Sequence, residues 1–228
     1  MIDNLVVGQS ARRADRAGAA APWRLACLLT LGAFLGLGLA AYAAGALPGD
    51  LSIRQELLVE DKSLLHAVAI TVNHAGKWHV LLPACLLLFA CSKVARRHWW
   101  LWSGMLLASG LVEQSSKFLV GRARPSGSAL GFPSGHTTAA AVFAVSVVYL
   151  VSRERLSPAA RLAIQIVAVV MMAMVGWARV VLHAHWPTDV LGGFLLGAGC
   201  AAAGAWWEIA RDERPARART APASSVSA

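Results

Sequence analysis

Apolar runs long enough to cross a bilayer recur along almost the whole chain. About 20 apolar residues in one α-helix span the roughly 30 Å of hydrocarbon, and helices satisfy their own backbone hydrogen bonds where lipid cannot. The composition agrees, because 57% of the 228 residues are hydrophobic and 14% are charged, which is rare in soluble domains. We therefore expect an all-α integral membrane protein with one helical-bundle domain.

Gly, Pro and charged residues interrupt these runs and divide them into six predicted transmembrane helices. The first run ends in small residues that resemble a signal-peptide cleavage site, but a secretory core has only about 7–15 residues, so we expect this run to be retained. Charged residues among spaced leucines between Gly49 and Ser63 indicate a surface segment with amphipathic character. The spans are expected at residues 23–47, 78–94, 99–120, 136–151, 162–182 and 188–209.

The two ends of the chain differ in composition from this core. Residues 1–22 are rich in Ala and Arg without apolar periodicity, and residues 211–228 are basic and contain Pro and Ser. Both compositions are typical of disorder. The sequence thus predicts a disordered basic cytoplasmic arm at 1–22, a six-span domain at 23–210 and a disordered basic cytoplasmic tail at 211–228.

Lys and Arg fall unevenly on the two predicted sides of the membrane. Fourteen of the 21 basic residues lie on the side that carries both termini, and cytoplasmic flanks are enriched in this way. The net charge of +9 therefore reflects topology, and we do not expect nucleic acid as a partner. The remaining seven basic residues are Arg54, Lys62, Lys77, Lys117, Arg122, Arg124 and Arg179.

Three of these outer cations are expected to converge at one end of the bundle. Lys117, Arg124 and Arg179 together suit a phosphate dianion, because Arg binds phosphate oxygens bidentately and Lys adds a point charge. Lys117 is costly at membrane depth unless it faces a polar interior; Glu113, four residues earlier, either orients it or makes a separate buried contact. Arg122 either touches a second phosphate or the lipid headgroup, or anchors the interface.

The stretch Gly-Phe-Pro-Ser-Gly-His-Thr-Thr at residues 131–138 opens the fourth predicted span. Anions bind at helix N-termini, where backbone N–H groups and the helix dipole point outward. Gly135 permits close approach of the backbone, and Ser134 can donate a hydroxyl hydrogen bond. His136 is placed to protonate a leaving oxygen.

His185 and Asp189 flank Pro187 where the last span begins. A carboxylate that accepts from one ring nitrogen fixes the tautomer and leaves the other nitrogen nucleophilic, and phosphorus is the natural electrophile beside so many cations. His183 makes a His-X-His pair with His185, but the further ligands of a metal site are missing. We expect His183 to line the loop, as a structural residue or near the substrate, and we predict no metal and no cofactor.

In order along the chain, these residues resemble the three-part signature of the type 2 phosphatidic acid phosphatase superfamily, which includes bacterial lipid phosphatases and vanadium haloperoxidases. The first part, Lys, six residues, Arg-Pro, is matched by Lys117 through Pro125. The second part, Pro-Ser-Gly-His, is matched by Pro133 to His136. Three parts in this order are a specific match, although each alone is weak.

The third part of the signature is Ser-Arg, five residues, His, three residues, Asp. Its spacing is matched by Arg179, His185 and Asp189, but Ala178 stands where the family has Ser. We expect this change to alter packing or hydrogen bonding without abolishing activity, because the Ser is neither nucleophile nor acid in the family.

The resemblance implies a metal-independent phosphatase in which His185 is the nucleophile, His136 the acid and Asp189 the partner of His185. A phosphohistidine would form and water would release phosphate. The implied substrate is a lipid phosphate or diphosphate, such as undecaprenyl diphosphate, phosphatidylglycerol phosphate or phosphatidic acid, at the periplasmic face of a bacterial inner membrane. By resemblance, phosphate is bound by Lys117, Arg124, Ser134, Gly135 and Arg179.

Other functions use part of the same constellation. The phosphoryl group could pass to another lipid instead of water, since the intermediate would be the same. A transporter or scaffold that only binds an anion has no need of the His185 and Asp189 arrangement, and the vanadate-dependent oxidases resemble larger, soluble proteins. The sequence leaves open which lipid is the substrate and how many copies of the chain associate.

Overall fold

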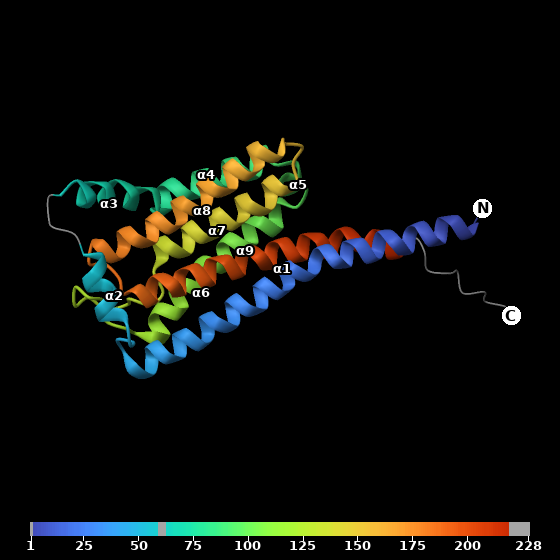
Figure 1. Ribbon diagram of the computed structural model, residues 1–228. Helices are drawn as coiled ribbons and strands as arrows, with labels where there is room; N and C mark the ends of the chain where they lie inside the picture. Colours follow the sequence, from blue (N-terminus) through green and yellow to red (C-terminus); the bar gives the residue numbers. More distant parts are fainter. Residues whose placement is uncertain (1, 59–62, 219–228) are drawn as a thin grey trace.

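All regular structure in the described part of the chain is α-helical, and the all-α prediction is confirmed. The computed structural model describes the backbone of residues 2–58 and 63–218 and the side chains of residues 18–58 and 63–211. Figure 1 shows an elongated bundle with α2 and α3 at one end and α5 at the other. The helices are α1 (Ile2–Ala44), α2 (Asp50–Leu57), α3 (Leu64–Ala75), α4 (Trp78–Cys91), α5 (Lys93–Arg97), α6 (Trp99–Val120), α7 (Gly135–Ser152), α8 (Pro158–Val181) and α9 (Pro187–Ala218).

Helix α7 is the most buried helix, and its many Ala, Ser and Thr residues let its neighbours approach closely. A Cβ at Gly193 of α9 would collide with the side chain of Thr137, and one at Gly197 would collide with the Thr138 carbonyl oxygen. The α9 backbone therefore lies directly against α7. This contact brings the N-termini of the two helices together, and the Ser134 N–H donates to the Asp189 carbonyl at 3.0 Å.

Helix α1 runs beside α9 along most of its length (Figure 1). Residues 2–22, predicted to be a disordered arm, continue this helix, because Ala and Arg are strong helix formers and α1 already supplies the nucleus. Helix α9 likewise continues past residue 211 to Ala218. The rest of the predicted tail, 219–228, lies outside the described residues.

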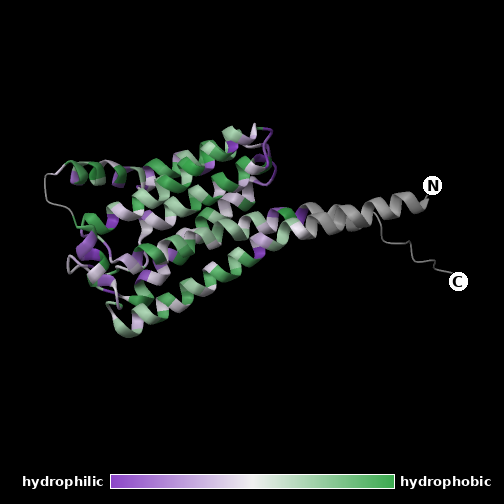
Figure 2. Ribbon diagram, in the orientation of Figure 1, coloured by the Kyte–Doolittle hydropathy of each residue, from purple (hydrophilic) through white to green (hydrophobic). Residues whose placement is uncertain are grey.

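Four described helices are long and apolar enough to cross a membrane: 18–44 of α1, 135–152 of α7, 158–181 of α8 and 187–211 of α9. A fifth span results if α3 and α4, which meet at a bend of 53°, count as one. Figure 2 shows hydrophobic residues along the bundle and hydrophilic ones gathered at its two ends. The chain is an integral membrane protein.

The prediction of six spans exceeds the four or five spans that these apolar helices provide. Helix α6 has the predicted bounds of the third span, but it is not among the candidate spans. Its second half carries Glu113, Gln114, two Ser residues and Lys117, which lower its mean hydropathy. These polar residues explain why α6 is less apolar than the four helices above.

Candidate active site

Three segments meet at the end of the bundle that carries α2 and α3: the α6–α7 loop, the start of α7 and the α8–α9 connection. Helix α6 is capped by Gly121, whose φ of 61° favours glycine. The loop then folds back on itself, because the Gly131 N–H donates to the Arg122 carbonyl at 2.7 Å. This loop brings Arg124 toward Arg179 and His185, on which its charge acts.

The predicted phosphate-binding cations make few bonds to carboxylates. Arg179 donates to the Asn73 side-chain oxygen at 2.5 Å, and Arg124 donates to the Leu130 carbonyl at 3.3 Å. Both acceptors are neutral, so among the described contacts neither guanidinium has its charge balanced. Lys117 differs, because it forms an ion pair with Glu113, which confirms the interpretation of Glu113 as its partner.

The start of α7 holds polar atoms that lack partners. The Ser134 hydroxyl oxygen and the His136 Nε2 are both buried and have no hydrogen-bond partner among the described residues. Buried polar atoms are ordinarily paired, so unpaired ones in a site facing cations suit a ligand. Gly135 lies between them, and a Cβ there would meet the Glu113 Oε1 at 2.7 Å, so any larger residue would displace the Glu113 carboxylate.

His185 and Asp189 lie together as their spacing predicted. The His185 Nδ1 is 3.4 Å from the Asp189 Oδ2, and the two residues are 2% and 0% exposed. The same carboxylate oxygen accepts the Trp186 N–H at 3.0 Å. An imidazole that uses Nδ1 toward the carboxylate carries its free lone pair on Nε2.

The electrostatics around His185 favour a neutral imidazole. Burial lowers the pKa of His185 below its ordinary value of 6.5, and the charges of Arg179 and Arg124 lower it further. The hydrogen bond and charge of Asp189 oppose these effects, but the net shift is downward. A ring nitrogen is therefore unprotonated at neutral pH, as a nucleophile requires.

Arg122 and His183, the two loop candidates, have structural contacts. The Arg122 side chain is 1% exposed and pairs with the carboxylates of both Asp189 and Asp50. It is therefore neither a headgroup contact nor an interfacial anchor, and the sequence interpretations of it were wrong. His183 adopts a φ of 55° and its Nδ1 lies 2.5 Å from the Arg54 Nη2, a contact that links the α8–α9 connection to α2.

Sequence reasoning missed Asp50 and Asn73 as members of this site. Asp50 was assigned to a surface segment, yet it is fully buried. Asn73 contacts Arg179 across 106 residues of sequence, so no local pattern marks it. The only available signal was Pro48-Gly49 before Asp50, which indicates a tight corner at which the chain returns toward the bundle.

A groove leads from this site into the apolar part of the bundle, between α4, α6 and α7. Its volume is about 370 Å³. Glu113, Lys117 and His136 line its polar end. Farther along, the walls are apolar, with Leu81, Leu82, Cys85, Leu106 and Val142.

Comparison with known proteins agrees with this geometry. The model of the PAP2 superfamily matches residues 97–213. The chain is similar to phosphatidylglycerophosphatase B of Bacillus subtilis (strain 168), with 32% identity over 176 residues that cover 72% of this chain and 85% of that one. It is also similar to an uncharacterized 22.5 kDa protein in the cps region of Klebsiella pneumoniae, with 34% identity over 133 residues, 56% of this chain and 63% of that protein.

Two crystal structures share the fold. A transmembrane PAP2-type phosphatidylglycerolphosphate phosphatase from Bacillus subtilis superposes with a TM-score of 0.68 at 26% identity, covering 82% of this chain and 96% of that one. LpxE from Aquifex aeolicus has a TM-score of 0.57 at 19% identity, with 71% and 97% coverage. The second likeness concerns the fold alone.

Proposed function

This chain belongs to the PAP2 superfamily, in the branch of bacterial membrane proteins that resemble phosphatidylglycerophosphatases, and from that membership we propose that it is a metal-independent lipid phosphatase. The observation that carries the proposal is the buried His185–Asp189 pair together with Arg124 and Arg179, whose described acceptors are neutral oxygens. A nucleophile and an open cationic site together suit phosphoryl transfer.

The reaction proceeds in two steps. The His185 Nε2 attacks phosphorus while the bond from phosphorus to the lipid oxygen breaks, and His136 gives its proton to that oxygen. Lys117, Arg124 and Arg179, with the Ser134 hydroxyl and the Gly135 N–H, stabilise the charge on the equatorial oxygens. A water, deprotonated by His136, then attacks the phosphohistidine and releases phosphate, which restores His185 and protonates His136 again.

A lipid substrate is supported by the groove that opens from the site. Its 370 Å³ extend from Lys117 and His136 along apolar walls, so a hydrocarbon chain can lie there while its phosphate reaches the cations. The activity for which the Bacillus subtilis relatives are named makes phosphatidylglycerol phosphate the first substrate to test. Undecaprenyl diphosphate and phosphatidic acid are the comparators, and transfer to a second lipid is the alternative outcome.

We also propose that α6 is a membrane span and that the bundle has six. The polar residues that lower its hydropathy include Ser109 and Glu113, which are buried inside the bundle, whereas Leu111 and Phe118 are exposed on its outer face. Lipid would therefore contact mostly apolar side chains. With six spans, both termini lie on the cytoplasmic side, where positive charge is enriched, and the site opens at the periplasmic face.

Substitution of the nucleophile tests the activity. Purified protein in detergent, treated with a chelator, is expected to release phosphate from phosphatidylglycerol phosphate and to form an acid-labile phosphoenzyme. H185A is expected to lose both, with turnover reduced by about four orders of magnitude or more, as when the nucleophile of other covalent catalysts is removed. Phosphate release by H185A at the wild-type rate would contradict the assignment of the nucleophile.

A further inference from the structure

Behind the His185–Asp189 pair, one buried arginine is held between two buried carboxylates. The Arg122 Nη1 donates to the Asp189 Oδ1 at 2.7 Å, and its Nη2 pairs with Asp50. All three side chains are at most 1% exposed. Removing three charges from water is costly unless each has partners, so this arrangement needs a reason beyond stability.

Both carboxylate oxygens of Asp50 accept hydrogen bonds. Its Oδ2 accepts the Leu47 N–H at 2.9 Å, and its Oδ1 accepts the Thr188 N–H at 3.0 Å. The Thr188 hydroxyl lies 2.9 Å from both carboxylate oxygens, and it also accepts a hydrogen bond from the Arg122 Nη1 at 2.7 Å. Asp50 therefore ties the corner between α1 and α2 to the first turn of α9, immediately before Asp189.

The cluster also carries a net charge that acts on His185. Arg122 and Asp189 alone would be neutral as a pair, so Asp189 would stabilise a positive imidazole only weakly. With Asp50 included, one cation and two anions leave one net negative charge behind His185. An attacking imidazole becomes positive as its bond to phosphorus forms, and this charge favours that state.

We propose that Asp50 is a positioning residue for the hydrolytic reaction, acting through Arg122 and Thr188. It holds the Asp189 carboxylate in the orientation that binds the His185 Nδ1, and it keeps the charge behind the nucleophile negative. The inference rests on the proposed function, because it assigns a role relative to the nucleophile. Asp50 does not touch the substrate in this role.

A change of charge at Asp50 has a predictable sign at His185. The charged and titratable groups around His185 are Asp189 from α9, Arg179 from α8, Arg124 from the α6–α7 loop and His136 from α7. Asp50 adds a negative charge behind them, which favours the imidazolium. Removing that charge lowers the pKa of His185 further, so the ring becomes a weaker base and a weaker nucleophile.

D50N tests the proposal, since it preserves shape and removes the charge. We expect kcat for phosphatidylglycerol phosphate to fall about 10- to 100-fold, the range seen when residues that orient a reactive side chain are replaced, with KM changed less than about threefold. The acidic limb of the pH profile of kcat/KM should move to lower pH by about half a unit. The shift is small because Asp50 acts on His185 across the intervening Arg122 and Asp189 and not by direct contact. The matched control is E208Q, another buried carboxylate at the opposite end of the bundle, which should leave the kcat and the pH profile unchanged.

A second variant separates position from charge. T188V removes the hydroxyl that contacts Asp50 and Arg122 but keeps all three charges, so kcat should fall without a shift of the acidic limb. If D50N does not yield folded protein, a T188V enzyme with wild-type kcat overturns the proposal. For folded D50N, a wild-type kcat or an unmoved acidic limb overturns it. H185A distinguishes the two levels of inference, because activity retained in H185A overturns the proposed function, whatever D50N does.

Discussion

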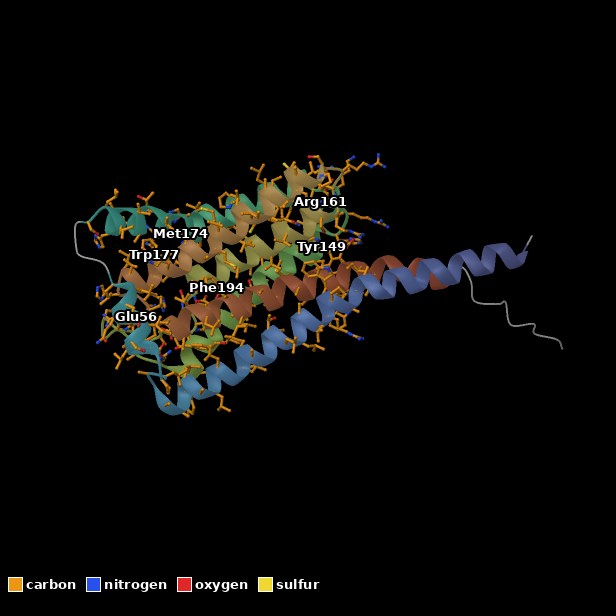
Figure 3. The ribbon with its side chains drawn as sticks, viewed as in Figure 1. Glu56, Tyr149, Arg161, Met174, Trp177 and Phe194 are labelled. Carbon is orange, nitrogen blue, oxygen red and sulfur yellow. The ribbon has the colours of Figure 1, made fainter. Side chains whose placement is uncertain are left out.

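The two ends of the bundle differ in how their charged side chains are paired. At the end with α2, Arg124 and Arg179 donate only to neutral oxygens, and the His136 Nε2 has no partner among the described residues. At the opposite end, acidic groups receive donors: Tyr149 donates to Glu208, and Glu154 accepts from Ser92 and from the Lys93 N–H. Figure 3 shows the two ends, with Glu56 near the first and Tyr149 and Arg161 at the second.

The difference follows from what each end has to do. Carboxylates at the Tyr149 end accept hydrogen bonds that join α9 to α7 and the α7–α8 connection to α5, which favours stability. At the other end, the guanidinium groups of Arg124 and Arg179 have no carboxylate partner among the described contacts, which costs stability unless an anion binds there. One set of helices thus has an end built for packing and an end built for binding. Substitutions of one residue type at both ends sharpen this comparison.

The largest difference is expected for arginines at opposite ends of α8. R179K keeps the charge but removes the planar fork that binds phosphate oxygens in pairs, so kcat/KM should fall about 100-fold or more, the size seen when one charge-stabilising donor is lost. R161K is the control, because Arg161 donates to the Glu154 carbonyl at the other end of the same helix. Phosphate release by the two variants measures the effect, and equal activities would break the comparison.

A smaller difference is expected for two glycines. In G135A the new methyl group would meet the Glu113 Oε1 at 2.7 Å and the Lys117 Nζ at 3.3 Å, so the ion pair must shift away from the phosphate site. We expect kcat/KM to fall about tenfold, corresponding to about 1.4 kcal/mol. G104A, on α6 toward the opposite end of the bundle and with no atom within 4 Å of its Cβ, should retain wild-type kinetics. A G135A enzyme with normal kcat/KM would exclude tight packing as the reason for this glycine.

The smallest effect on activity is expected at the Tyr149 end. Y149F removes a buried hydroxyl that donates to Glu208, which should lower the unfolding free energy by about 1–3 kcal/mol and leave kcat unchanged. Thermal unfolding in detergent and phosphate release measure the two effects. Y42F, in which the replaced ring is 67% exposed, should change neither. Lower kcat in Y149F at full folding would show that the two ends are coupled.

Sequence reasoning reached the residues of the candidate site that follow a local spacing. His185 and Asp189 are one helical turn apart, so their contact is set by local geometry, and the residues around Ser134 open a helix wherever that helix packs. The same reasoning failed for Arg122. Its neighbours in sequence suggested a lipid interface, but its partners, Asp50 and Asp189, lie 72 and 67 residues away.

The sequence by itself determined the membrane class, the family and the order of the reactive residues, because hydrophobic length and motif spacing are properties of the chain. Only the tertiary structure decided which charges are balanced. Packing α7 against α9 through Gly193 and Gly197 aligns two helix starts, and the return of the chain at Asp50 then closes Arg122 between two carboxylates. Burial sets the strength of the interactions between these charges, and burial depends on contacts between segments that no local pattern encodes.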